Sequence, residues 1–272
     1  MYDPAHAESW DAVGLVCGDP GQVVRRVLFA VDPVAAVVDE AIEWGADLIV
    51  AHHPLYLRGT TSVATTHHKG RIIHRLIKND VALYTAHTNA DVADPGVSDA
   101  LAWAVGLIGP LRPLRPLATD TRRGLGRIGE LPERMPLGEF AELAAKGLPQ
   151  TAGPLRVAGD PDRMVRTIAV CGGAGDSLLD TARAARVDVF LTADLRHHPA
   201  SEFMEAAAHG DGPALIDAAH WATEWPWLGD AASRLASRLG AKGTTVETRV
   251  SDKVTDAWTA VASSPIRLDS LP

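Results

Sequence analysis

The sequence predicts an α/β protein made of two duplicated halves with mainly parallel sheets. Two observations lead to this prediction. Short apolar strands alternate with amphipathic helices, and the strand–helix–strand pattern of residues 26–51 recurs about 140 residues later along the chain. Such units build parallel sheets, because two parallel neighbouring strands need a long crossover between them. The 272 residues allow one large domain or two domains of ordinary size.

The first unit shows the pattern element by element. Residues 26–32 form a short, β-branched apolar run that is typical of a buried strand. Pro33 then opens a helical pattern that ends at Gly45, in keeping with the preference for Pro inside the start of a helix and Gly just past its end. The elements expected next are a strand at 47–51, an amphipathic helix at 70–79 and a strand at 81–86.

A shift of 141 residues places this unit on a second one without a gap. Residues 47–50 then fall on residues 188–191. With a shift of 133, residues 82–87 fall on residues 215–220, so that one histidine falls on another. We therefore expect two copies of a β-α-β-α-β unit, each with polar residues directly after its strands.

The rest of the chain is less regular. Residues 109–116, with three prolines, are expected to be an extended connection without regular structure. Further expected elements are strands at 124–130, 154–159 and 244–250 and helices at 137–145 and 231–239. This divides the chain into a first half (1–112), connecting strands and a helix (113–159), and a second half (160–272) whose C-terminal part packs back on the first.

Composition excludes several classes of protein. Hydrophobic residues make up 46% and charged residues 22%, which is ordinary for a globular domain and not for a disordered chain. No apolar run of about 18 residues is present, so no membrane span is expected. Cys17 and Cys171 are too few for a disulfide framework, and together with the absence of a signal-peptide pattern they favour the cytoplasm. A formal charge of -8 argues against nucleic acid as a partner.

Histidine is the unusual residue. In open α/β sheets, ligands bind outside the carboxyl ends of the strands. The chain places there His52, His53, His87, Asp91, Asp194, His197, His198, His220 and Glu224. Imidazole and carboxylate groups are ligands for zinc, iron, manganese or nickel. Adjacent histidines on an extended segment point in opposite directions, so His52 and His53 suit two neighbouring metal ions, which Glu224 could bridge.

Each of these signals also has a purely structural interpretation. A single His-His pair is more often a polar turn, and the pair at residues 67–68 has no nearby carboxylate and is expected to be solvated. His220 and Glu224 are four residues apart, but Pro226 favours a strand-to-helix turn over a pair inside a helix.

Two further features leave both interpretations open. The glycine-rich residues 171–176 could offer N–H groups to a phosphate, although a tight turn is favoured because the segment lacks a P-loop pattern. Trp221, Trp225 and Trp227 could stack on a base, but a core or interface position is the default.

Five blocks in order resemble the NIF-three-like family, whose members are often named GTP cyclohydrolase 1 type 2. They are residues 8–18 (ESWDAVGLVCG), 47–54 (DLIVAHHP), 86–91 (AHTNAD), 188–198 (DVFLTADLRHH) and 217–224 (DAAHWATE). The resemblance implies intertwined three-layer α/β/α halves, a dinuclear metal centre and a homohexamer. It also implies the metal ligands, with the glutamate between two divalent metal ions: His52, His53, Asp91, His220 and Glu224.

The resulting hypothesis is a metal-dependent hydrolase of a small, nucleotide-like molecule, with the cyclohydrolase activity resting on the resemblance alone. Asp11, His87, Asp194 and His198 are the candidates for moving protons, or for orienting the metal ligands instead. The alternative is a metal-binding ring that acts as a scaffold for a protein partner. Because the ligands come from both halves, the site is expected to lie between them. The three tryptophans near 221–227 and residues 110–116 are expected to contribute to an oligomer interface.

Overall fold

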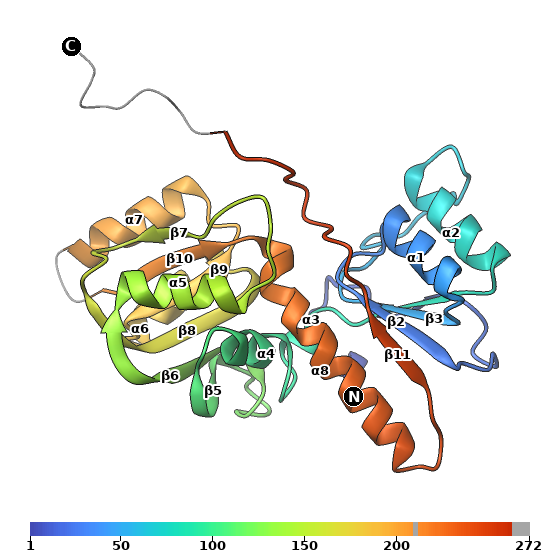
Figure 1. The fold of residues 1–272 in the computed structure, drawn as a ribbon, viewed down its shortest axis with the longest axis horizontal. Helices are drawn as coiled ribbons and strands as arrows, with labels where there is room; N and C mark the ends of the chain where they lie inside the picture. Colours follow the sequence, from blue (N-terminus) through green and yellow to red (C-terminus); the bar gives the residue numbers. More distant parts are fainter. Residues whose placement is uncertain (209–211, 263–272) are drawn as a thin grey trace.

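The computed structural model describes residues 1–208 and 212–262 and has the expected α/β class, with two mainly parallel sheets (Figure 1). The first sheet has the strand order β1-β4-β3-β2-β11, and all of its pairs are parallel except β1–β4. Its strands are β1 (Gly14–Cys17), β2 (Arg26–Ala30), β3 (Leu48–Ala51), β4 (Ala82–Thr85) and β11 (Glu247–Val250). Because β11 comes from the C-terminal region and pairs with β2, the last part of the chain completes the first sheet.

Helices cover both faces of this sheet. α1 (Ala35–Trp44) and α2 (His68–Lys78) pack on one face, where Leu28, Ile49 and Leu83 are buried. α8 (His220–Gly240) packs on the other, against Val27 and Phe29. The alternation of Val27, Leu28 and Phe29 between the two faces follows from the two-residue period of a strand. The first half is therefore a three-layer α/β/α structure.

The second sheet has the order β5-β6-β8-β9-β10-β7, with parallel pairing of β8–β9–β10 at its centre and antiparallel strands on both sides. One face packs on α4 and α5, and the other on α6 and α7. The strands are β5 (Ile108–Pro116), β6 (Gly124–Pro136), β7 (Arg156–Ala158), β8 (Met164–Ala174), β9 (Val189–Ala193) and β10 (Ala214–Ala218). The helices are α4 (Val97–Ala104), α5 (Leu137–Gly147), α6 (Leu179–Ala184) and α7 (His197–Ala208), besides the short α3 (Thr88–Asp91), η1 (Pro4–His6) and η2 (Asp176–Leu178).

The two sheets share a local hydrogen-bond pattern that supports the duplication. Asp47 Oδ2 accepts hydrogen bonds from two successive backbone N–H groups at the start of β2, at 2.7 and 2.8 Å. Asp188, 141 residues later, accepts the same pair at the start of β8, both at 2.8 Å. The gapless offset between the first two strands of each unit is thus repeated in the hydrogen bonds.

The offset predicted for the third strand is wrong by one residue. Leu48 pairs with Ala82 in the first sheet, and Val189 pairs with Ala214 in the second. Since Leu48 and Val189 are 141 residues apart, Ala82 corresponds to Ala214, an offset of 132 rather than 133. An apolar run that is buried on both faces looks similar after a slip of one residue, so only the pairing partner fixes its register.

Residues 109–116 are not an irregular connection, as expected, but belong to β5. β5 lies at the edge of the second sheet and pairs only with β6. Proline lacks the N–H that a central strand needs on both sides, but an edge strand has one side without a partner. A proline-rich segment can therefore be a strand at this position.

Other differences concern where helices begin. α1 begins at Ala35, so Pro33 precedes the helix and is not its first residue, whereas Gly45 caps its end with φ 70° as expected. The last helix begins at His220, eleven residues before the predicted start. Pro226 lies inside it, at a cost of about 3 kcal/mol or more for an interior proline. Burial of Trp221 and Trp227 against the first sheet offsets this cost.

Among the described residues, no helix has the length and apolar character needed to cross a membrane. α4 and α8 lie between the two sheets in Figure 1, and α8 contacts strands of both. α8 therefore connects the two halves at the place where the carboxyl ends of β3 and β10 deliver their polar residues.

Candidate metal centre

His52 and His53 directly follow β3. Their backbone N–H groups donate to the carbonyls of Ala30 and Val31 at 3.0 and 2.9 Å, so the pairing with the β2 segment continues past the end of the strand. This pairing fixes the backbone from which both imidazole rings project. His52 is fully buried and His53 is partly exposed.

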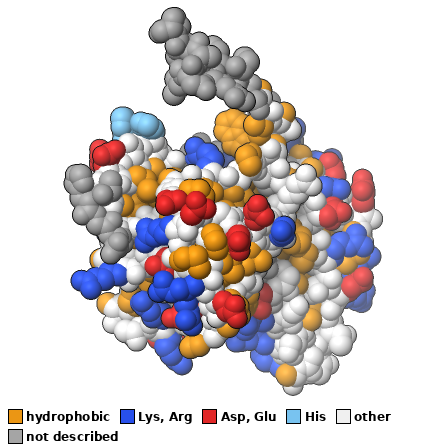
Figure 2. Space-filling view, turned by 60° about the vertical axis from the view of Figure 1, so that its left-hand side comes forward, with side chains coloured by type: hydrophobic (Ala, Val, Ile, Leu, Met, Phe, Trp, Pro, Cys, Tyr) orange, Lys and Arg blue, Asp and Glu red, His pale blue; other side chains and the backbone are white. Residues whose placement is uncertain are grey.

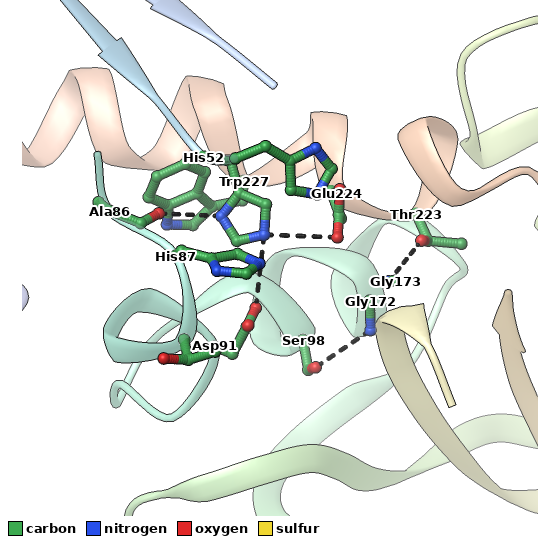
Figure 3. A network of polar contacts seen from close by, with 12 residues as sticks. His52, Ala86, His87, Asp91, Ser98, Gly172, Gly173, Thr223, Glu224 and Trp227 are labelled. Carbon is green, nitrogen blue, oxygen red and sulfur yellow. Dashed lines mark hydrogen bonds and ion pairs between the residues drawn. The ribbon is translucent and has the colours of Figure 1, made fainter. Parts of the chain in front are cut away.

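Both rings reach the carboxylate of Glu224, one at each oxygen. His52 Nε2 lies 3.4 Å from Glu224 Oε1, and His53 Nε2 lies 3.1 Å from Oε2 (Figure 3). His220, one turn earlier on α8, places its Nε2 2.9 Å from Oε1. His52, His53, His220 and Glu224 are called the histidine–glutamate centre below. They come from both halves of the chain, as the sequence predicts for a site between the halves.

His220 and Glu224 form an i,i+4 pair in the first turns of α8, and not in a turn outside the helix as predicted. Residues four apart lie on the same helix face, so the helix presents both side chains to the ends of the first-half strands.

Each histidine of the centre is held through its other ring nitrogen. His52 Nδ1 donates to the carbonyl of Ala86 at 2.9 Å, which leaves Nε2 without a proton in the neutral ring. His53 Nδ1 pairs with Asp32 Oδ1, and His220 Nδ1 with Asp194 Oδ2, both at 2.7 Å. This arrangement is typical of metal-binding histidines, in which a carbonyl or carboxylate fixes the ring orientation and tautomer.

Asp91 and His87 lie beside the centre. Asp91 Oδ1 is 3.7 Å from His52 Nε2, and Figure 3 shows its carboxylate turned toward that ring. His87 Nδ1 pairs with Asp11 Oδ1 at 2.9 Å, and the other oxygen of Asp11 accepts from the backbone N–H of Thr88 at 3.0 Å. Asp11 therefore fixes the His87 ring in the way that Asp32 and Asp194 fix theirs.

The centre has a strong affinity for positive charge. Burial alone would raise the pKa of Glu224, but His53, His52 and His220 surround the carboxyl and hold its pKa well below the usual value. Burial opposes protonation of the histidines, yet Glu224 raises the pKa of His53 to about 11 and that of His220 to about 10. A divalent cation would use the same attraction in place of the protons.

The donor atoms fit metal ions. Ligand atoms of His52, His53 and His87 lie within 4.8 Å of one another, and so do those of His53, His220 and Glu224. His52 Nε2 and Glu224 Oε2 are enclosed and have no hydrogen-bond partner of good geometry among the described residues. Leaving such atoms unpaired is costly in a protein interior, and a divalent ion would satisfy both.

The glycine-rich segment lies against the centre. β8 runs through residues 171–174, and a Cβ at Gly173 would lie 2.6 Å from Glu224 Oε1. The N–H of Gly173 donates to Thr223 Oγ1 at 2.9 Å and that of Gly172 to Ser98 Oγ at 3.3 Å (Figure 3). Because these N–H groups already have partners, this part of the segment makes room for the centre rather than a phosphate site.

The structure does not bring every predicted residue to the centre. His198 lies on α7, is exposed, and packs its ring on that of His197. Asp32, by contrast, was not among the predicted site residues, although it ends the first predicted strand at the same sheet edge as His53. Its position after a strand was the available signal.

The tryptophans of α8 are largely internal. Trp227 is fully buried and Trp221 nearly so, and both pack against the first sheet together with the partly exposed Trp225. The prediction that they lie on an oligomer interface is wrong for Trp221 and Trp227, because the first sheet already covers the apolar face of α8. The exposed tryptophans are Trp10, Trp103 and Trp258.

Comparisons with known proteins agree over nearly the whole chain. The sequence model of the family described as Duf34/NIF3 (NGG1p interacting factor 3) matches residues 1–257. A Streptomyces coelicolor protein named GTP cyclohydrolase 1 type 2 homolog is 59% identical over 97% of this chain and 92% of its own length. The crystal structure of a Bacillus cereus protein related to NIF3 gives a TM-score of 0.86 at 28% identity and covers 96% of both chains. A hypothetical protein of Staphylococcus aureus gives 0.85 at 28% identity, covering 95% of this chain and 94% of its own.

Proposed function

Because the chain belongs to the Duf34/NIF3 family, we propose that its histidine–glutamate centre binds two divalent metal ions and hydrolyses a small nucleotide-like molecule. The observation that carries this proposal is the position of Glu224, whose two carboxylate oxygens face different histidines from different halves of the chain. A carboxylate with one oxygen toward each of two ligand groups suits a pair of ions about 3.5–4 Å apart, the spacing common in two-metal hydrolytic sites.

The ligand set of the proposed centre combines both halves. His52, His53 and Asp91 come from the first half, and His220 and Glu224 come from α8. These residues would hold zinc, iron, manganese or nickel, since imidazole and carboxylate accept each of these ions. When bound, the ions would lower the pKa of a water molecule and polarise the substrate.

His87 is the residue that we propose as the proton acceptor. Burial and the nearby His52 lower its pKa from the usual value, so that the ring is neutral at physiological pH. Its Nδ1 hydrogen bond to Asp11 leaves Nε2 to accept a proton. Asp194 acts as a positioning residue through His220, and Asp32 does so through His53.

The substrate class follows from the relatives. Homologues of this chain bear the name of a GTP cyclohydrolase, and we propose that a purine nucleotide or a close analogue is the substrate. Release of product from GTP, other nucleotides and simple phosphoesters would be measured with metal-supplemented protein and with the His53→Ala, Glu224→Ala double variant. Metal-dependent turnover that the double variant lacks supports a hydrolase. Equal background rates for both proteins would refute it and favour the scaffold hypothesis.

We further propose that the chain forms a homohexamer. Trp10 and Ile108 are more than half exposed, and such apolar side chains gain by association when neighbouring copies cover them. Light scattering should give about six times the 28.8 kDa mass of the chain. A particle with the mass of a single chain at micromolar concentration would contradict this proposal.

A further inference from the structure

A pocket of about 590 Å³ opens beside the histidine–glutamate centre. His220 and Asp194 form its wall on the side of the centre, Arg156 lies on the β7 side, and Asp256, Trp258 and Val261 close it from the C-terminal segment, residues 252–262. Its volume lies in the range of about 300–1,000 Å³ that small-molecule sites occupy. A molecule in this pocket would touch a residue of the centre.

The C-terminal segment is tied to the same centre. Thr255 Oγ1 donates to Asp32 Oδ2, while the other oxygen of that carboxylate pairs with His53 Nδ1 at 2.7 Å. Just before the segment, Ser251 Oγ donates to Glu40 Oε2 at 2.6 Å. Figure 1 shows the chain leaving β11 and passing across the region between the two halves. The segment is therefore held where it can form one wall of a site at the centre.

Trp258 projects from this wall. It is 74% exposed, whereas Trp227 of α8 is fully buried. Figure 2 shows hydrophobic side chains gathered where the segment leaves the body of the molecule. An indole ring that lines a pocket and has this much free surface offers a face on which a flat ring can stack.

Asp256 supplies a polar group to the same pocket. The residue is partly exposed, but its Oδ2 is enclosed and has no hydrogen-bond partner among the described residues. An ionised carboxylate only accepts hydrogen bonds, so it requires N–H or O–H donors. Rotation about the Cβ–Cγ bond is soft, and either oxygen can turn to the pocket. The guanidinium of Arg156 binds Asp217, so it is already engaged elsewhere.

We propose that this pocket binds the heteroaromatic ring of the substrate, with Trp258 stacked on the ring face and Asp256 accepting hydrogen bonds from adjacent N–H donors on the ring edge. A guanine ring presents such donors at N1–H and the 2-amino group. An adenine ring presents an acceptor at N1, which would face the carboxylate without a proton between them. The pocket therefore selects a guanine-type edge. This inference rests on the proposed function and deepens it, because it assigns the residues that choose the ring.

The test is equilibrium binding of guanosine and adenosine to the full chain by calorimetry. Wild-type protein should bind guanosine at least tenfold more tightly than adenosine. Trp258→Ala should weaken guanosine binding about 5- to 150-fold, the equivalent of the ~1–3 kcal/mol of one base–aromatic stack. Asp256→Asn should reverse the preference, because an amide can donate to N1 of adenine and accept from its amino group.

The matched controls lie outside the pocket. Trp103→Ala removes another exposed tryptophan, on α4, and Asp252→Asn changes an exposed carboxylate only four residues from Asp256. Both should leave guanosine affinity unchanged. Equal wild-type affinity for the two nucleosides, or losses in Trp258→Ala no larger than in the control, would overturn the inference.

Metal content separates this result from a failure of the proposed function. Trp258→Ala should retain the metal content of the wild-type protein, because Trp258 touches none of the proposed ligands. A wild-type chain that selects guanosine but binds no zinc would refute the proposed metal centre and leave the ring site standing. A metal-loaded chain without nucleoside preference would refute the ring site alone.

Discussion

Substitution of Gly173 by alanine tests whether the backbone of β8 makes room for the centre. Gly173 has φ 69°, and its ideal Cβ would lie 2.6 Å from Glu224 Oε1 and 3.1 Å from His220 Nε2. Reaching an ordinary contact of 3.4 Å requires the glutamate oxygen to recede by about 0.8 Å. Glu224 is 3% exposed, so its side chain has no open solvent to move into.

Two effects of different size follow. A left-handed φ costs a non-glycine residue roughly 1–2 kcal/mol, and this lowers the free energy of unfolding in the absence of metal. For a chain of this size, the melting temperature should fall by about 2–8 °C. Displacement of Glu224 by most of an ångström exceeds the ~0.2 Å within which metal–ligand distances are usually held. Zinc affinity should therefore fall by at least about 10–100-fold, the loss seen when the support of a ligand is removed.

Gly229→Ala is the matched control. Gly229 lies in α8, on the same helix as Glu224, without a positive φ and with no atom within 4 Å of its ideal Cβ. Alanine there should raise stability by roughly 0.5–1 kcal/mol, because it lowers the entropy that the helix loses on folding. The assays are thermal unfolding of chelator-treated protein and competitive zinc titration. Wild-type stability and zinc affinity in Gly173→Ala would refute the reasoning.

Four further outcomes are expected. Elemental analysis should find about two divalent ions per wild-type chain, and Glu224→Ala should lose at least one; a chain that holds none after dialysis against zinc, manganese or iron would contradict the proposed centre. Asp32→Asn should lower zinc affinity about 10–100-fold with little change in melting temperature, because it disturbs only the support of His53, whereas an unchanged zinc titration would count against that role. The raised pKa values of His53 and His220 stabilise chelator-treated protein fully below about pH 6.5, and this contribution is lost as pH rises through about 10 and 11; zinc affinity should rise over the same range, since zinc displaces those protons, and a pH-independent titration would argue against protonated ligands. Asp99→Ala should cost about 3–5 kcal/mol in denaturant unfolding, because it leaves the buried guanidinium 2.8 Å from that carboxylate without a charge partner; a loss below 1 kcal/mol would show that the pair is dispensable.

Much of the site was predictable because its position depends on local patterns. Short apolar strands identify themselves by their residues, and the polar residues after them must lie at one edge of a parallel sheet. His52 and His53 follow β3 for this reason, and the pairing of Asp47 and Asp188 with successive N–H groups repeats the offset found in the sequence. The five proposed metal ligands were thus identified before any coordinates, although their role as ligands remains a prediction.

Features that depend on distant partners were not predictable in the same way. Residues 109–116 form a strand only because β6 pairs with one side and nothing among the described residues pairs with the other. The burial of Trp227 requires the first sheet to cover α8. Asp32 joins the site because β2 and β3 are adjacent, so that its carboxylate meets His53.

The sequence alone therefore determined the α/β class, the order of most strands and helices, and the set of side chains at the strand ends. Those properties follow from periodicity and chain direction, which every short segment carries by itself. Only the tertiary structure decided the register of the third repeated strand, the start of α8 at His220, and the meeting of the C-terminal segment with Asp32. These depend on contacts between residues as many as 223 positions apart, whose free energy no local pattern contains.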